Sequence, residues 1–512
     1  MRTHRTLVAS LVVALVAHSA LARAQSVAPI VYTVRVPAPE THYLEVEATF
    51  PASGRAAIDL MMPVWSPGYY RVEPYAEHVD RLTAHAAAGV ELGIEHTQPN
   101  RWRVQTGGAS RVTLSYRVFG NEHTVTTNDI GADYGVINGA PTFITLAESG
   151  SRPHEIHLEL PAQWPRVATG LDAAADGRPN HFRAPDYETL VDSPIMAGRL
   201  EIHEFTVAGK RHDVAAAGNT AGWDGERAAQ DLARYVGAVD RFWGFLPYDH
   251  YAFLLVFRPG GGGLEHKTST LSTVAVRPGV TPWPGIGLLS HEYFHLYNVK
   301  RLRPVELGPF DFEHPPRTGS LWIAEGVTSY YSSLLLERAG LRTREDYLAA
   351  LSRLIAQLQN SPGRLLQSVE QSSLDVWNNS NSGVNPNAST VSYYNKGEVL
   401  GLLLDAKIRR ATNGRRSLDD VMRREYERFS GARGYTADEF RATAEEVAGV
   451  DLREWFHRSV SSTEELDYTD LLECYGLRFA DGDANDRWRL EFRPSPSASQ
   501  QANVAAWLTP ST

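Results

Sequence analysis

The hydrophobic pattern changes its period part-way along the chain, and this change constrains the fold more than any other feature. From about residue 30 to residue 205 apolar residues recur at every second position, as in Leu44, Val46 and Ala48. Such alternation places one side of a strand on a core and the other in water, which is typical of antiparallel sheet. From about residue 224 the apolar residues recur at helical spacing. We therefore expect an α+β chain of several domains, with an N-terminal antiparallel β domain followed by a mostly helical domain.

The same patterns predict individual elements. We expect a buried strand over 251–258 and helices over 224–243, 286–299, 320–338, 344–359 and 394–411. Ser417 with Asp420, and Thr436 with Glu439, have the spacing of helix-capping pairs and predict two further helix starts. A polar loop is expected at 378–390. The tail from residue 479 is rich in Ser, Ala, Gln and Pro and is expected to hold little packed structure.

Composition and charge exclude several classes of protein. The chain has 512 residues, 43% of them hydrophobic and 21% charged, which argues for a globular core rather than extended disorder. Its net charge of −10 leaves no excess of basic residues for the phosphates of nucleic acid. A single cysteine, Cys474, excludes an internal disulfide framework and a metal site made only of cysteines. Any metal must therefore be held by histidine and carboxylate.

The first 24 residues have the pattern of a secretory signal peptide. Arg2 and Arg5 precede a mostly apolar run over 7–20, and Ala22 and Ala24 supply the small residues of a cleavage site after Ala24. The run is shorter than the ~20 residues of a membrane-spanning helix. An uncleaved membrane anchor is the alternative interpretation. Cleavage gives a periplasmic or secreted protein without stable membrane insertion.

The expected organisation follows from these features. It comprises a signal peptide at 1–24, an N-terminal β domain at 25–205, a helical domain at 206–465 and a largely irregular C-terminal remnant at 466–512.

Residues 291–295 read His-Glu-Tyr-Phe-His, the HExxH pattern. Residues four apart lie on one face of a helix, so the rings of His291 and His295 can reach one zinc ion at ~2.0–2.1 Å. Glu292 can then lie beside a metal-bound water as its general base. A polar patch on a surface helix is the alternative interpretation. Apolar residues on most sides of this helix oppose it, because two histidines and a glutamate are costly to bury without partners.

A catalytic zinc site needs a third protein ligand and an open position. The metzincin pattern is excluded, because Asn298 and Arg301 stand where that class has glycine and histidine. Glu325 is the strongest candidate, since it is an isolated acid early in a long apolar stretch. An acid favoured by the helix dipole is the alternative interpretation. Weaker candidates lie in a Pro-rich loop, namely Glu306, Asp311, Glu313 and His314.

The two segments HEYFHLYNVKRLRP at 291–304 and LWIAEGVTSYY at 321–331 resemble the glycyl aminopeptidase family of gluzincin zinc metallopeptidases, relatives of aminopeptidase N and thermolysin. The resemblance covers roughly residues 30–475 and includes Trp-Ser-Pro-Gly-Tyr at 65–69. It implies a thermolysin-like catalytic domain with one Zn²⁺ per chain, bound by His291, His295 and Glu325, with Glu292 as general base.

The segment Pro-Gly-Gly-Gly-Gly-Leu-Glu-His at 259–266 follows the predicted strand. A phosphate-binding loop is excluded, because Glu265 stands where that pattern requires glycine. The segment instead resembles the GxMEN-type motif of gluzincin aminopeptidases. That match implies that Glu265 pairs with the substrate's α-ammonium, while Gly262 and Gly263 line the substrate backbone. A flexible turn with a solvated glutamate is the alternative, and His266 either binds substrate or has a structural role.

Ser-Tyr-Tyr-Asn-Lys-Gly at 392–397 resembles the Y-x-K-G motif of the same family. The match implies that Tyr394 donates a hydrogen bond to the oxyanion of the transition state. Tyr393 is the alternative donor, and packing of both rings is the structural interpretation.

The sequence therefore predicts a zinc aminopeptidase that acts on peptides with a free N-terminus, and the resemblance alone implies a preference for Gly or Ala. One rival is a thermolysin-like zinc endopeptidase, and another is a non-catalytic peptide-binding protein that retains the fold. Members of the family commonly continue into a PDZ domain. After residue 477 this chain offers only one strand-like stretch, so we expect no functional PDZ domain.

Overall fold

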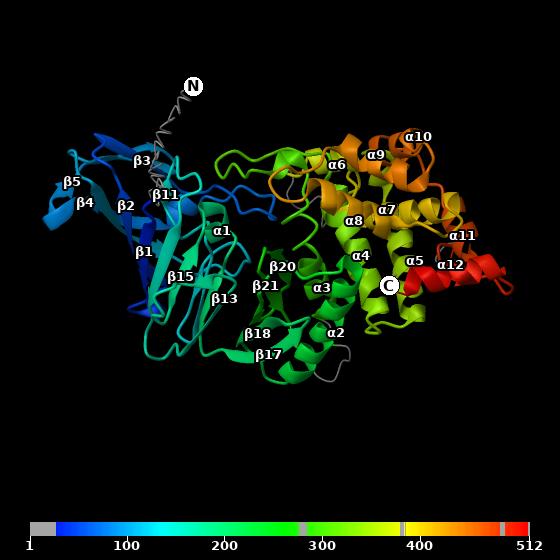
Figure 1. The fold of residues 1–512 in the computed structure, drawn as a ribbon, viewed down its shortest axis with the longest axis horizontal. Coiled ribbons are helices and arrows are strands. Elements are labelled where there is room, and N and C mark those ends of the chain that lie inside the picture. Colours follow the sequence, from blue (N-terminus) through cyan, green and yellow to red (C-terminus); the bar gives the residue numbers. More distant parts are fainter. Residues whose placement is uncertain are drawn as a thin grey trace, which may run out of the picture.

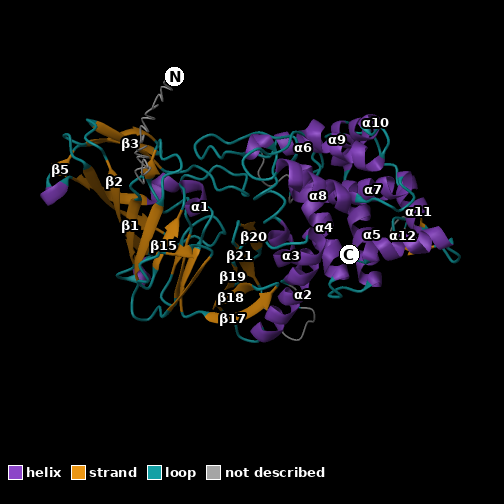
Figure 2. Ribbon diagram, viewed as in Figure 1, coloured by secondary structure: helices purple, strands orange, loops and turns teal. Residues whose placement is uncertain are grey.

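The computed structural model describes residues 27–275, 283, 285–378, 383, 386–481 and 487–509. The expected signal peptide at 1–24 lies outside the described residues, as does part of the polar loop expected at 378–390. None of the described helices is both long enough and apolar enough to cross a bilayer. Strands gather at one end of the molecule and helices at the other, with a smaller sheet between them (Figures 1 and 2). The predicted α+β class is confirmed.

The largest sheet of the β domain has eight strands. Their bounds are Ile30–Arg35 (β1), Tyr43–Pro51 (β2), Val79–His85 (β4), Glu91–Leu92 (β5), Arg111–Phe119 (β8), His154–Glu159 (β12), Asp172–Ala173 (β14) and His181–Ala184 (β15). Their order is β14-β15-β12-β1-β2-β8-β4-β5. The neighbours are antiparallel as predicted, except β1 and β12, which pair in parallel. The alternation along β2 buries Leu44, Val46 and Ala48.

Two four-stranded antiparallel sheets complete this domain. The strands of the first are Arg166–Thr169 (β13), Ile195–Gly198 (β16), Tyr134–Ile137 (β10) and Asp129–Ile130 (β9), and those of the second are Thr145–Leu146 (β11), Ala57–Met61 (β3), Arg101–Gln105 (β7) and Ile94–Gln98 (β6). A short helix, Tyr187–Val191 (α1), precedes β16. Tyr187 and Leu190 of α1 pack in the core of the β domain, so the end of this helix is fixed in place.

A five-stranded mixed sheet lies between the β domain and the helices (Figure 2). Its strands are Glu201–Val207 (β17), Lys210–Gly218 (β18), His250–Phe257 (β19), Ser269–Val274 (β21) and Gly262–Glu265 (β20), in that order across the sheet. The apolar run in β19 is continuous because both of its faces are covered. Phe253 and Leu255 join the core of the helical domain, whereas Leu254 and Val256 pack with Met196 of the β domain.

The remaining chain is mostly helical. The helices are Gly225–Trp243 (α2), Ile286–Phe294 (α3), Thr328–Arg338 (α4), Arg344–Asn360 (α5), Val369–Leu374 (α6), Tyr393–Ala411 (α7), Leu418–Phe429 (α8), Ala437–Ala448 (α9), Arg453–Phe456 (α10), Thr469–Tyr475 (α11) and Ala498–Leu508 (α12). A π-helical turn, Trp322–Val327 (η5), runs directly into α4. The starts of α8 and α9 carry the predicted capping boxes. However, α3 ends five residues before its predicted end at residue 299.

The prediction of a largely irregular C-terminal tail is wrong. Leu477–Phe479 (β22) and Leu490–Phe492 (β23) form a hairpin, and α12 packs on the helical core. Trp507 of α12 is completely buried, stacks on Tyr475 and donates a hydrogen bond to the hydroxyl of Tyr330. The polar composition misled the prediction, because three buried apolar side chains, Val504, Trp507 and Leu508, and a capping box at Ser497 hold this helix.

Candidate metal centre

Helix α3 presents the first two residues of the HExxH pattern. Its apolar side packs in the helical core through Ile286 and Leu289, and its C-terminal end carries His291 and Glu292. The helix ends at Phe294, so His295 occupies the C-cap position. The chain then turns, and the amide of Lys300 donates to the carbonyl of His295 at 3.0 Å.

His291, His295 and Glu325 converge as the sequence predicts. The Nε2 atoms of His291 and His295 lie 2.9 Å apart. Oε2 of Glu325 lies 3.1 Å from Nε2 of His295 and 3.5 Å from Nε2 of His291. Ligands of a tetrahedral zinc ion at ~2.0–2.1 Å are roughly 3.3 Å apart, so the spacing of the three atoms fits zinc.

The outer nitrogens of both rings are engaged, which frees the inner nitrogens for a metal. Nδ1 of His295 lies 2.9 Å from the carbonyl of Asn298, which only accepts, so this nitrogen carries the proton. The hydroxyl of Ser329 donates to the carbonyl of Glu325 at 2.9 Å and faces Nδ1 of His291 at 3.4 Å as an acceptor. In the neutral rings the lone pairs of the two Nε2 atoms therefore face each other, and they repel unless a proton or a metal ion lies between them.

The electrostatics of this cluster favour a cation. Burial would lower the pKa of His295, but the carboxylate of Glu325 outweighs it and raises that pKa to about 10. Burial acts in the opposite direction on Glu325, whose pKa is nevertheless lowered to about 2 by the two histidines. Positive charge is therefore stabilised between these three side chains.

The π-helical turn η5 presents Glu325. Such turns widen a helix locally and recur at functional sites. The side-chain amide of Asn298 donates to the carbonyls of Ile323 and Ala324 at 2.9 and 3.3 Å, which ties η5 to the segment after α3. Asn298 thus positions Glu325 with its side chain and His295 with its backbone carbonyl.

The segment after α3 is strained. Val299 has a φ of 124°, a conformation that a β-branched residue rarely adopts. Such strain costs about 1–3 kcal/mol and persists only where the surrounding contacts impose it. The bonds of Asn298 on one side and the burial of Lys300 on the other impose it here. Helix α3 ends earlier, at Phe294, where the amides of Leu296 and Tyr297 bond to carbonyls three residues back, and the positive φ of Val299 excludes a helix through the predicted end at 299.

Helix α7 crosses η5 at a pair of glycines. A Cβ added to Gly326 would lie 2.4 Å from the Cα of Gly397, so the two backbones are in direct contact. This crossing places Tyr394 beside the metal ligands, with its ring 6.0 Å from that of His291. Tyr393 stacks on Tyr394. The hydroxyl of Tyr393 is covered by Gly383, because a Cβ on Gly383 would lie 2.5 Å from that oxygen. Of the two phenols, Tyr394 is the one whose ring neighbours a metal ligand.

The metal ligands line a cavity of ≈ 480 Å³ between the two domains. The glycyl edge of β20 and Glu265 form one wall, since this strand lies at the edge of its sheet. A Cβ on Gly263 would lie 2.2 Å from Oε1 of Glu292, so only glycine fits between the strand and this carboxylate. Gly262 has a φ of 144°, which also favours glycine.

Glu265 is capped by the β domain. A Cβ on Gly68 would lie 2.3 Å from Oε1 of Glu265, and Gly68 has a φ of 97°. Oε1 of Glu265 is buried without a hydrogen-bond partner among the described residues. Burial raises the pKa of this carboxyl, while the nearby Lys300 acts to lower it. The carboxylate of Glu265 thus faces the cavity, and none of the described residues forms an ion pair with it.

Glu292 lies between these groups and is 5% exposed. Burial raises its pKa to about 8, and the carboxylates of Glu265 and Glu325 act in the same direction. Glu292, Glu265 and His295 form a second cluster of potential metal-ligand atoms. Among the described residues, both such clusters lie at this one centre.

Two groups of predicted residues lie elsewhere. His266 is 3% exposed and does not line the cavity, and its Nδ1 donates to Asp192 at 3.1 Å. The loop acids are engaged with other partners: Glu306 accepts from Thr318, Glu313 binds Arg101, and Asp311 pairs with His314.

The sequence reasoning missed several contributors to this centre. Asn298, Ser329 and Gly68 position ligands or substrate-facing groups, and Tyr70 lines the cavity. Only the proximity of Asn298 to His295 could have indicated its role, because the others depend on contacts between distant segments.

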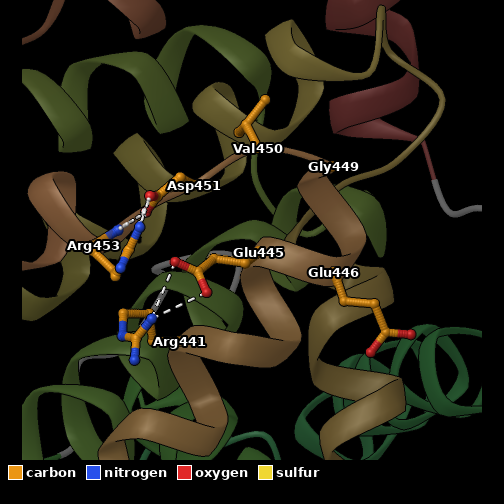
Figure 3. A pocket seen from close by; sticks show the side chains of 7 residues that line it. All are labelled: Arg441, Glu445, Glu446, Gly449, Val450, Asp451 and Arg453. Carbon is orange, nitrogen blue, oxygen red and sulfur yellow. Dashed lines mark hydrogen bonds and ion pairs between the residues drawn. The ribbon is translucent and has the colours of Figure 1, made fainter.

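A second hollow of ≈ 630 Å³ lies on the surface of the helical domain (Figure 3). Arg441 binds Glu445 and Arg453 binds Asp451 around it, while Glu446 pairs with Arg424 and Arg428, so each of its charged side chains has a partner of opposite charge. It contains none of the predicted site residues and is not a candidate active site.

Comparison with protein families gives two matches in the order in which the domains occur. The Peptidase M61 N-terminal domain matches residues 31–199, and the M61 glycyl aminopeptidase domain matches residues 285–400. Together they span more than half of the chain. The chain belongs to the M61 glycyl aminopeptidase family. It is therefore a peptidase, and the second match contains His291, Glu325 and Tyr394.

Solved structures agree with this family assignment. An aminopeptidase N family protein from Idiomarina loihiensis is 27% identical, with a TM-score of 0.81 over 88% of this chain and 78% of that one. An M1 zinc metallopeptidase from Deinococcus radiodurans is 14% identical over 86% of this chain and 95% of its own, with a TM-score of 0.53. Native yeast LTA4 hydrolase is 14% identical over 86% and 68%, with a TM-score of 0.52. The last two show a common fold. A comparison with functionally curated proteins gave no match.

Proposed function

We propose that this M61 family peptidase is a zinc-dependent aminopeptidase that removes single residues, Gly or Ala above all, from the N-termini of peptides. Zinc is supported by the spacing of the Nε2 atoms of His291 and His295 and the Oε2 of Glu325. The preference for Gly is supported by the family description, and that for Ala rests on the resemblance of the sequence motifs alone.

One observation carries the choice of an aminopeptidase. The buried carboxylate of Glu265 shares the cavity of the metal ligands and is covered by the backbone of Gly68. A carboxylate pairs well with a substrate ammonium, and such a charge-assisted bond is strong in a buried site. If the substrate had a further residue on the N-terminal side of the one bound to Glu265, that residue would collide with the backbone of Gly68. This closed end disfavours the thermolysin-like endopeptidase.

The balance of buried charge supports the same conclusion. Among the described residues, three buried carboxylates line the centre, those of Glu265, Glu292 and Glu325. The buried ammonium of Lys300 is nearby, but it forms an ion pair with a fourth carboxylate, that of Asp192. A divalent cation and the ammonium of a peptide N-terminus would balance the remaining negative charge. Burying unbalanced charge is costly, so both ligands are expected to bind cooperatively.

The residues supply the steps of peptide hydrolysis in this arrangement. Zinc, when bound, polarises the scissile carbonyl and makes water more acidic. Glu292 takes a proton from the water that attacks the carbonyl carbon and delivers it to the leaving amine as the C–N bond breaks. The Tyr394 hydroxyl donates a hydrogen bond to the oxyanion, which carries charge only in the transition state. Glu265 holds the α-ammonium, so one residue fits between that anchor and the scissile bond.

The signal-peptide pattern in residues 1–24 supports a further proposal, that the mature enzyme acts in a periplasm or outside the cell.

The test is hydrolysis of alanine p-nitroanilide and its N-acetylated form by the same enzyme preparation, with and without a chelator. We expect chelator-sensitive cleavage of the free amine and at least a 100-fold lower kcat/KM for the acetylated compound, as befits loss of a buried charge pair. Equal rates on the two compounds would instead support the endopeptidase, and no rate on any peptide would support a binding protein.

A further inference from the structure

Behind Glu265, on the side away from the cavity, a buried carboxylate of the β domain binds three residues of the catalytic domain. Asp192 follows α1 and is 6% exposed. It receives three donors from the catalytic domain: the ammonium of Lys300 at 2.7 Å, the amide of Lys267 at 2.8 Å and Nδ1 of His266 at 3.1 Å. These residues are absent from the lining of the cavity, so this cluster does not touch substrate.

The three donors come from the two segments that form the centre. His266 and Lys267 immediately follow Glu265 in the chain. Lys300 belongs to the turn after His295, whose carbonyl accepts from the amide of Lys300. Asp192 therefore connects the segment that carries the amine anchor to the segment that carries a metal ligand.

The charges reinforce this connection. Lys300 is buried between Asp192 and Glu265, and both carboxylates act to raise its pKa against the effect of burial. Among the described residues, Asp192 is the carboxylate that forms an ion pair with Lys300, and Oε1 of Glu265 has no hydrogen-bond partner, which leaves Glu265 free for the ammonium of a substrate. If Asp192 lost its charge, Lys300 would have only Glu265 as a buried carboxylate partner and would compete with the substrate for it.

We infer that Asp192 and Lys300 are positioning residues that fix Glu265 relative to the metal ligands and keep it available for the substrate's amine. This inference rests on the proposed aminopeptidase function. It gives the β domain a part in substrate selection, because Asp192 belongs to that domain and reaches the anchor only when the two domains are packed together.

The experiment compares the wild type with Asp192→Asn, Lys300→Met and Asp192→Glu. For each we would measure KM, kcat and the ratio of kcat/KM between alanine p-nitroanilide and its N-acetylated form. This ratio does not depend on the fraction of enzyme that is folded, so partial unfolding does not obscure it. Asp192→Asn and Lys300→Met should raise KM for the free amine at least 10-fold, with zinc retained, and lower the ratio by a similar factor. Asp192→Glu should recover part of the ratio.

Asp419→Asn is the matched control, because Asp419 forms an equally buried ion pair with Arg338 at 2.9 Å but does not line the cavity. It should lower stability and leave the ratio unchanged. Wild-type ratios in both Asp192→Asn and Lys300→Met would overturn the inference. A wild-type enzyme that cleaves both compounds equally would contradict the proposed function itself, so the two failures are distinguishable.

Discussion

The backbone of Gly326 lies against the backbone of Gly397, and this contact holds Glu325 and Tyr394 beside each other. A methyl group at position 326 would sit 2.4 Å from the Cα of Gly397, which the packed helices cannot accommodate without moving apart. The contact joins the turn that presents Glu325, the proposed metal ligand, to the helix that presents Tyr394, the proposed oxyanion donor.

Gly326→Ala should therefore separate Tyr394 from the metal ligands. A displacement of about 1 Å costs roughly 100-fold in rate, so we expect kcat to fall by that order. Steady-state kinetics and zinc analysis check this. Gly287→Ala is the control, since a Cβ at Gly287 of α3 meets nothing within 4 Å, and it should keep wild-type kcat. Unchanged kcat in Gly326→Ala would show that close contact between η5 and α7 is not needed to position Tyr394.

Tyr394→Phe tests the oxyanion donor directly. The substitution removes one hydroxyl and keeps the ring beside His291. Loss of one such donor costs about 10²–10³ in kcat, and KM should change little because the bond forms in the transition state. Tyr393→Phe is the matched control and should retain most activity. If Tyr393→Phe is the more damaging variant, the assignment of the two phenols is reversed.

The C-terminal helix should contribute strongly to stability. Trp507 is completely buried, and its backbone carbonyl accepts two hydrogen bonds from Arg338 at 2.9 and 3.0 Å. Trp507→Ala should lower the free energy of unfolding by about 3–5 kcal/mol, measured by urea denaturation. Gln501→Ala on the exposed side of α12 should change it by less than about 0.5 kcal/mol. A Trp507→Ala variant as stable as the wild type would mean that the helix does not pack as described.

Stability should also fall in mild acid. His154 is completely buried against Tyr32, and burial lowers its pKa to about 4. Its pKa in the unfolded chain is about 6.5, so only the unfolded state binds this proton between those values. Stability therefore decreases as the pH falls from 6.5 towards 4, by up to about 3 kcal/mol, and is unaffected by this group at higher pH.

The check is the melting temperature between pH 7 and pH 4.5. His154→Gln should show a shallower decrease than the wild type, whereas substitution of the exposed His96 by Gln should not. Parallel curves for the wild type and His154→Gln would contradict the prediction.

The sequence predicted those parts of the fold and centre that depend on local pattern. The alternation in β2 and the capping boxes of α8 and α9 are decided by neighbouring residues, and so is the i, i+4 spacing of His291 and His295. The end of α3 was mispredicted because the apolar pattern continues through Val299, whereas the backbone leaves the helix after Phe294 in turns fixed by tertiary contacts such as those of Asn298. Helix α12 was missed because the polar composition of the tail obscured the short i, i+3, i+4 pattern of its buried residues, Val504, Trp507 and Leu508.

Contacts between segments that are distant along the chain could not be predicted from the sequence. Gly68 and Asp192 reach Glu265 and its neighbours from strands and loops more than seventy residues away along the chain. Glycine at position 68 signals a turn in any sequence, and a single aspartate at the end of a helix signals a cap. Their roles appear only when the β domain packs against the five-stranded sheet.

The most direct test of the metal centre compares two buried glutamates of similar exposure, Glu325 and Glu292. Zinc content per chain would be measured by elemental analysis of purified Glu325→Ala and Glu292→Ala, alongside the wild type. Both variants should be inactive, but Glu292→Ala should keep about one zinc per chain, while Glu325→Ala should lose most of it, because three protein ligands are needed to hold the ion. A Glu325→Ala protein that still carries one zinc per chain would contradict the account.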